Sequence, residues 1–163
     1  DTGGKTMYGI TEQVARDNGY EGNMLELPIE TATDIYVNSY VIAPNYDRIV
    51  KVSAPVGHKL IDAGVNTGTY RVSLWFQKAL NSLSRDGTDY KLIAEDGVIG
   101  PATVTAYKSL ELVRGKAKAC ELVIKLIDIQ QGNHYLQLQN HRDFTVGWID
   151  HRIQNVPIEK CTN

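Results

Sequence analysis

The chain has 163 residues, of which 42% are hydrophobic and 22% charged, and its formal net charge is −2. This length suits one compact domain, or one domain with a small additional unit, and the composition excludes a mainly disordered chain. The small net charge argues against a general nucleic-acid-binding protein, because such proteins gather positive charge. The apolar runs are also too short to predict a stable membrane span.

Helical patterns dominate the first part of the chain. Thr11 is the predicted N-cap of a short helix over residues 12–18, which ends at Gly19. A second helix is expected to open at Pro28. Its buried face is predicted to carry Ala32, Ile35, Tyr36 and Tyr40. Ser53 is predicted to cap a third helix with proline in its first turn. The residues that this helix is expected to bury are Val56, Leu60, Ile61 and Val65.

The remaining chain also favours helices. Residues 70–83 carry the clearest amphipathic pattern, with apolar side chains at three- and four-residue spacing. Short apolar pieces on both sides of Asp96 and Gly97 predict a small β-hairpin. The later helices are expected over residues 101–110, about 116–139 and 144–153, with a kink or break at Gly132. The predicted fold class is therefore mainly α, with at most a small β-hairpin.

The cysteines and histidines predict neither a metal site nor a cofactor. The two cysteines do not make a disulfide framework, and Cys120 falls on an apolar helical face. We therefore predict that Cys120 is a buried free thiol and not the partner of Cys161. The four histidines lack the H-x-x-x-H and H-E-x-x-H spacings of zinc sites.

The first thirteen residues carry the most specific motif of the chain. They read D-x-G-G-x-T-x-Y-G-I-T and lead directly into the first predicted helix. This pattern resembles the N-terminal signature of the phage-endolysin-type N-acetylmuramidases of glycoside hydrolase family 108. The resemblance implies a catalytic glutamate in an E-G-G-Y segment upstream of Asp1. It also implies that Asp1 and Thr6 complete the catalytic group, with Asp1 assisting on the base side and Thr6 positioning water or substrate.

Other residues in the N-terminal region are candidates for sugar binding, and each has a structural alternative. Asp1 to Gly4 could form a simple polar turn, with Thr6 as a local cap. Tyr8 and Tyr36 present ring faces that suit stacking on a pyranose. Tyr36 and Tyr40 lie one helical turn apart, however, which also favours packing in the core.

Two further motifs follow in the order found in this family. The segments 61–68, 75–81 and 96–103 resemble the predicted peptidoglycan-binding domain that follows the muramidase segment. Asp62 and Asn66 are the candidate substrate-binding residues there, since an amide both donates and accepts hydrogen bonds. Residues 96–103 are interpreted as a structural turn and helix start. The segment 144–152 resembles the closing element of the family, and Trp148 is interpreted as a packing residue.

Taken together, the resemblance implies a lysozyme-like helical fold and a peptidoglycan hydrolase that cleaves the β-1,4 bond between N-acetylmuramic acid and N-acetylglucosamine. Residues 1–53 would belong to the catalytic segment and residues 54–163 to the peptidoglycan-binding region, packed as one compact unit. We expect a monomer whose partner is bacterial peptidoglycan. It would act in the periplasm after release from the host cytoplasm as a phage endolysin, or as a periplasmic or secreted bacterial protein. The alternatives are a non-catalytic peptidoglycan-binding module and a secretion activator or effector on the same fold.

Overall fold

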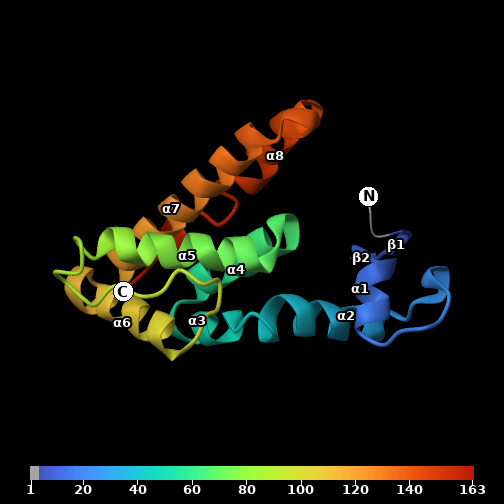
Figure 1. Ribbon diagram of the computed structural model, residues 1–163, viewed down its shortest axis with the longest axis horizontal. Helices are drawn as coiled ribbons and strands as arrows, with labels where there is room; N and C mark the ends of the chain where they lie inside the picture. Colours follow the sequence, from blue (N-terminus) through green and yellow to red (C-terminus); the bar gives the residue numbers. More distant parts are fainter. Residues whose placement is uncertain (1–3) are drawn as a thin grey trace. The chain divides into compact units, whose positions relative to one another are not determined.

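The computed structural model describes residues 4–163, and the chain separates into two compact units (Figure 1). The first unit ends at Ala43 and the second spans Pro44–Asn163. Helices dominate both, which confirms the predicted class. Across the described residues, no helix combines the length and the apolar character that crossing a membrane would require.

The first unit is a short β-hairpin followed by small helices. Its elements are β1 (Thr6–Met7), β2 (Ile10–Thr11), α1 (Glu12–Asp17), a 3-10 helix (Met24–Glu26), α2 (Ile29–Val37) and a π-helix (Asn38–Ile42). The strands are antiparallel, with Thr6 opposite Thr11. Thr11 caps α1 as predicted, because its hydroxyl accepts the Val14 backbone N–H at 3.2 Å. The helix stops before Gly19, whose φ of 90° favours glycine.

Apolar side chains from the hairpin and both α-helices form the small core of the first unit. Its buried members are Ile10, Ala15, Met24, Leu27, Ala32 and Ile35. The prediction that Tyr36 shares this buried face is wrong, because its side chain is 37% exposed. The reason is geometric. Tyr36 lies about 100° further round α2 than Ile35, which turns its ring out of the core.

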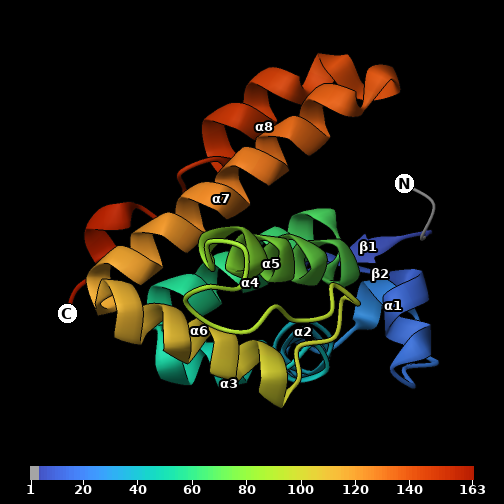
Figure 2. The ribbon, with the colours of Figure 1, turned by 60° about the vertical axis from the view of Figure 1, so that its left-hand side comes forward.

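The second unit is a bundle of helices (Figures 1 and 2). Its elements are α3 (Tyr46–Val52), α4 (Ala54–Thr67), α5 (Thr69–Leu83), α6 (Pro101–Arg114), α7 (Lys116–Gln137), α8 (Thr145–Arg152) and two 3-10 helices, Gln139–Phe144 and Ile158–Lys160. Ser53 ends α3 and accepts the Val56 N–H to cap α4, as predicted. Figure 2 shows α7 and α8 side by side, so the chain turns back after Gln137.

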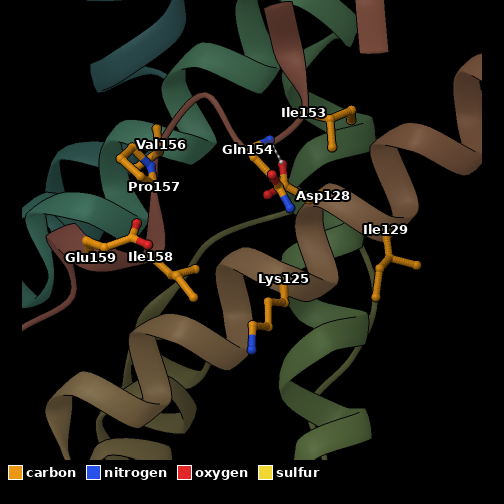
Figure 3. A pocket seen from close by; sticks show the side chains of 9 residues that line it. All are labelled: Lys125, Asp128, Ile129, Ile153, Gln154, Val156, Pro157, Ile158 and Glu159. Carbon is orange, nitrogen blue, oxygen red and sulfur yellow. Dashed lines mark hydrogen bonds between the residues drawn. The ribbon is translucent and has the colours of Figure 1, made fainter. Parts of the chain in front are cut away.

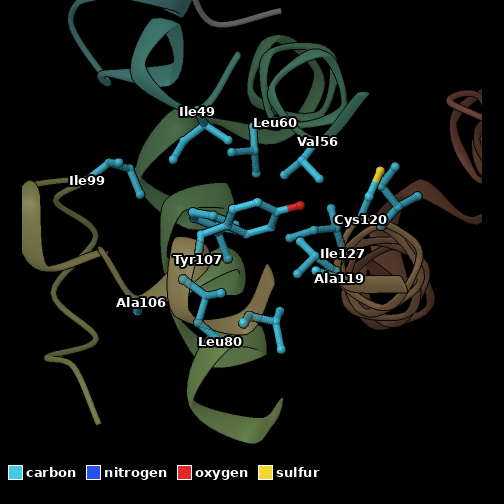
Figure 4. Packing of buried hydrophobic residues seen from close by; sticks show 14 of the residues in the cluster. Ile49, Val56, Leu60, Leu80, Ile99, Ala106, Tyr107, Ala119, Cys120 and Ile127 are labelled. Carbon is cyan, nitrogen blue, oxygen red and sulfur yellow. The ribbon is translucent and has the colours of Figure 1, made fainter. Parts of the chain in front are cut away.

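Tyr107 lies at the centre of the core of the second unit (Figure 4). Fully buried side chains such as Leu60, Leu80 and Ile127 surround it from three different helices. Burying each such side chain stabilises the fold by about 1.5–3 kcal/mol. Val65, which was predicted to be buried, is 37% exposed and lies outside this core.

The predicted hairpin around Gly97 is wrong, because residues 84–100 form an irregular loop without strands. Two side chains of α5 form hydrogen bonds with the backbone groups that a strand would use for pairing. Asn81 donates to the Ile93 carbonyl at 2.8 Å and accepts the Ile93 N–H at 2.9 Å. Gln77 accepts the Gly97 N–H at 2.8 Å and donates to the Val98 carbonyl at 2.9 Å. The loop is therefore pinned to the helix instead of pairing with itself.

Two predictions about α7 are also wrong. The helix is continuous through Gly132, where a Cβ would make only an ordinary contact, 3.8 Å from Ile153. Cys120 is not a free thiol but forms a disulfide with Cys161, with the Cα atoms 5.6 Å apart. The C-terminal segment folds back along α7 and places Cys161 at the start of that helix. A contact between segments so far apart in the chain produces no periodic pattern in the sequence.

Candidate functional site

The hairpin of the first unit presents the N-terminal motif. Tyr8 and Gly9 form its two-residue turn, and both have positive φ angles, 53° and 78°. Such turns match the twist of a hairpin, but a tyrosine rarely adopts this conformation. The strained turn leaves the Tyr8 side chain 55% exposed. Thr6, on the strand that leads into this turn, is also exposed. The structure therefore brings two of the predicted site residues together.

Gly4 and Glu12 meet at the base of this hairpin. Gly4 has a φ of 81°, and a Cβ built on it would lie only 3.0 Å from Glu12 Oε1. The glycine thus lets the backbone pass close to the carboxylate. The Glu12 backbone N–H also donates to the Lys5 carbonyl at 2.7 Å, which closes the base of the hairpin. The predicted catalytic residue Asp1 lies outside the described residues.

Arg16 commits the Glu12 carboxylate to a structural ion pair. The Arg16 Nη2 atom lies 2.7 Å from Glu12 Oε2. The other guanidinium nitrogen donates to the carbonyls of Tyr20 and Gly22, at 2.8 and 2.7 Å. Arg16 therefore fixes the loop after α1 and also holds the side chain of Glu12, which lies one helical turn earlier in α1. The Glu12 carboxylate is therefore engaged in the local structure of the first unit.

Tyr36 and Tyr40 form an aromatic pair at the junction between α2 and the π-helix. Their ring centroids are 5.4 Å apart and the ring planes are inclined by 56°. Tyr36 is exposed and Tyr40 is half-buried. The pair is thus a surface feature of the first unit, and a role for Tyr36 in sugar stacking stays a prediction.

Asp62 and Asn66 lie in the second unit, one turn apart on α4. Both are half-buried. The Asp62 carboxylate accepts a hydrogen bond from the Asn155 side chain, so it helps to hold the C-terminal segment on α4. Their role in substrate binding stays a prediction.

Comparison with known families accounts for nearly the whole chain. Residues 1–68 match the family described as Glycosyl hydrolase 108, and residues 71–153 match the one described as Predicted Peptidoglycan domain. The chain belongs to the family that carries the predicted peptidoglycan domain. The segment before that domain matches the glycosyl hydrolase 108 family.

A solved structure supports the same fold. The structure of Brucella abortus SagA superposes with a TM-score of 0.72 at 24% sequence identity. The alignment covers 98% of this chain and 81% of that one. No curated protein sequence is significantly similar to the chain.

Two motifs of the peptidoglycan domain, at residues 75–81 and 96–103, pack against each other. This agrees with the interpretation of residues 96–103 as a structural turn and helix start. Gln77, only 1% exposed, donates to Asp96 Oδ1 at 3.0 Å and to the Thr103 hydroxyl at 3.2 Å. Hydrogen bonds to this carboxylate from the Val98 backbone N–H and from the Gln77 amide lower the pKa of Asp96. Pro101 then starts α6. The motif thus joins α5 to α6 and has a structural role.

The closing motif of the domain, residues 144–152, packs against α7. Trp148 on α8 stacks on Tyr135 of α7, with the ring centroids 4.9 Å apart, and on Phe144 at 5.7 Å. The Arg152 guanidinium lies over the rings of Tyr135 and Trp148, within 6 Å of both. This cluster holds the α7–α8 hairpin together.

Sequence reasoning missed a buried ion pair beside the predicted residue Asp62. Lys59 is completely buried, and its Nζ atom lies 2.7 Å from Asp128 Oδ1 of α7. It also donates to the Arg152 carbonyl at 2.9 Å and to Asn155 Oδ1 at 3.0 Å. The available signal was its place on the apolar stripe of α4, one residue before Leu60. A lysine on such a stripe requires a buried partner.

Asp128 also borders a cavity of about 510 Å³ between α7 and the returning C-terminal segment (Figure 3). Its Oδ1 atom accepts the Gln154 backbone N–H at 3.2 Å, so the carboxylate fixes the segment where it leaves α8. The walls are mainly apolar, with Lys125 and Glu159 among the lining residues. The ion pair and this cavity belong to the packing of the C-terminal segment.

Proposed function

We propose that this protein is an N-acetylmuramidase that cleaves the β-1,4 bond between N-acetylmuramic acid and N-acetylglucosamine. The matches to the glycosyl hydrolase 108 family and to the predicted peptidoglycan domain support a peptidoglycan-directed glycosidase. The observation that carries the finer assignment is the strained, exposed hairpin, which presents Thr6 and Tyr8. Strained backbone of this kind gathers at functional sites.

In this proposal, the general acid is a glutamate that precedes Asp1 in the natural protein and protonates the glycosidic oxygen. Asp1 then assists on the base side, and the Thr6 hydroxyl orients water or substrate. Tyr8 offers its exposed ring to a sugar face. Tyr36, Asp62 and Asn66 contribute further substrate contacts. The protein would act on the cell wall outside the cytoplasm, as a phage endolysin or as a bacterial relative.

The role of the Thr6 hydroxyl can be tested in a protein that includes the proposed upstream glutamate. Thr6→Val keeps the branched shape that suits a strand but removes the hydroxyl, and Thr6→Ser restores the hydroxyl. Losing one hydrogen bond in the transition state, about 1.5–3 kcal/mol, would slow hydrolysis of purified peptidoglycan roughly 10- to 100-fold. Thr6→Ser should retain most of the rate. Thr105→Val, an exposed position on α6, serves as the matched control.

Two results would count against this assignment. Full lysis by Thr6→Val would remove Thr6 from the site. Full lysis after the upstream glutamate is replaced by glutamine would refute general-acid catalysis by that residue. If the natural protein sediments with peptidoglycan but never hydrolyses it, the non-catalytic binding module is favoured instead.

A further inference from the structure

A polar groove lies between α5 and α7 in the second unit. One helical stripe from each helix lines it, and each stripe follows the same i, i+3, i+4, i+7 spacing. The lining residues on α5 are Arg71, Leu74, Trp75 and Lys78, and those on α7 are Gln130, Asn133, His134 and Gln137. Glu95 adds to the lining from the pinned loop, and the groove holds about 430 Å³. We call this site the α5–α7 groove.

Two rings form its most apolar wall. The centroids of Trp75 and His134 are 5.8 Å apart, and both side chains are half-buried. Burial and the nearby charge of Arg71 lower the pKa of the His134 imidazole, which favours the neutral ring. Gln130 ties the two helices here, because its Nε2 atom donates to the Trp75 carbonyl at 3.0 Å. The wall is therefore fixed by packing and presents a ring surface suited to a sugar.

The rest of the lining is polar and carries opposite charges at defined places. Arg71 and Lys78 are exposed and lie seven residues apart on α5, which spaces their origins about 10 Å along the helix. Asn133 and Gln137 present exposed carboxamides from the facing helix. The Glu95 carboxylate is held by the Asn81 amide at 3.0 Å. Two cations, one carboxylate and three carboxamides suit a peptide with free carboxylates better than an uncharged glycan.

We propose that the α5–α7 groove binds the muramyl-peptide unit of peptidoglycan, with Trp75 against the sugar and Arg71 and Lys78 against the carboxylates of the stem peptide. The carboxamides of α7 then bind peptide or N-acetyl groups. This assignment rests on the peptidoglycan substrate proposed above. It gives the predicted peptidoglycan domain a defined site that binds the peptide as well as the glycan.

The test uses a single muramic acid that carries its tetrapeptide. This probe contains no glycosidic bond between two sugars, so it is not hydrolysed. Binding is followed by calorimetry, and by tryptophan fluorescence in the Trp148→Phe background, where Trp75 is the only tryptophan left. The variant Arg71→Gln/Lys78→Gln should weaken Kd at least tenfold. The control Arg48→Gln/Lys108→Gln removes the same charges from exposed positions on α3 and α6 and should change Kd less than twofold.

The outcomes separate this inference from the proposed function. Equal binding by the groove variant and the control variant overturns the inference, even if the natural protein hydrolyses peptidoglycan normally. Equally tight binding of an N-acetylglucosamine oligomer overturns it as well, because the charges would then have no ligand. Loss of probe binding in the groove variant, with an unchanged melting temperature, supports the inference, even if no hydrolysis is ever detected.

Discussion

Breaking the Cys120–Cys161 disulfide should destabilise the second unit by several kcal/mol. The bond joins residues 41 positions apart and closes the returning C-terminal segment onto α7. For a closed loop of this length, the chain-entropy relation gives about 4 kcal/mol of lost stability at 25 °C. A hydrogen bond from the Ala117 N–H to Asn163 Oδ1, 3.0 Å long, holds the same segment and would be lost with it.

Urea unfolding followed by circular dichroism measures this effect. Cys161→Ser is compared with the oxidised protein, and both are then measured again with a thiol reductant. A loss of about 4 kcal/mol corresponds to a fall in melting temperature of roughly 8–16 °C for a chain of this size. The reductant should lower the stability of the oxidised protein and leave Cys161→Ser unchanged. A difference below about 1 kcal/mol, or two titratable thiols in the native protein, would refute the reasoning.

Two further predictions concern buried polar groups. Lys59→Met leaves Asp128 buried without its partner, and should cost about 3–5 kcal/mol in urea unfolding. Lys59→Met/Asp128→Leu should recover most of that loss, and an equal loss in both variants would contradict the pairing. Burial raises the pKa of Tyr46 to about 12, so the folded state holds this proton more tightly than the unfolded chain does. The resulting stability is complete below about pH 10 and is lost as the pH rises through about 12. Ultraviolet titration should show a late tyrosinate phase that Tyr46→Phe reduces, whereas ordinary titration of all nine tyrosines would contradict it.

Local patterns predicted much of the fold. The amphipathic stripe predicted a helix over residues 70–83, and α5 spans Thr69–Leu83. The predicted caps of α1 and α4, at Thr11 and Ser53, are both confirmed. These features depend on neighbours within a few residues, so periodicity and capping chemistry are sufficient to find them.

The errors share a different physical origin. The residues around Gly97 are typical of a tight turn, which favoured a hairpin. The backbone of this loop instead bonds to Gln77 and Asn81, which lie more than ten residues away in the sequence. The Cys120–Cys161 bridge and the Lys59–Asp128 pair join segments far apart in the chain. Contacts of this kind are set by tertiary packing, which the spacing of residue types does not encode.

The candidate site divides in the same way. The motif itself pointed to Thr6 and Tyr8, and the structure places both on the exposed hairpin. The α5–α7 groove could not be predicted, because it forms only when two stripes 59 residues apart, beginning at Arg71 and Gln130, face each other.

The central claim is tested most directly by the reducing ends that the natural protein creates. Purified peptidoglycan is digested, the new ends are reduced with borohydride, and the products are identified by mass spectrometry. The proposed muramidase activity predicts N-acetylmuramitol at every new end. N-acetylglucosaminitol ends, or no new ends at all, would contradict it.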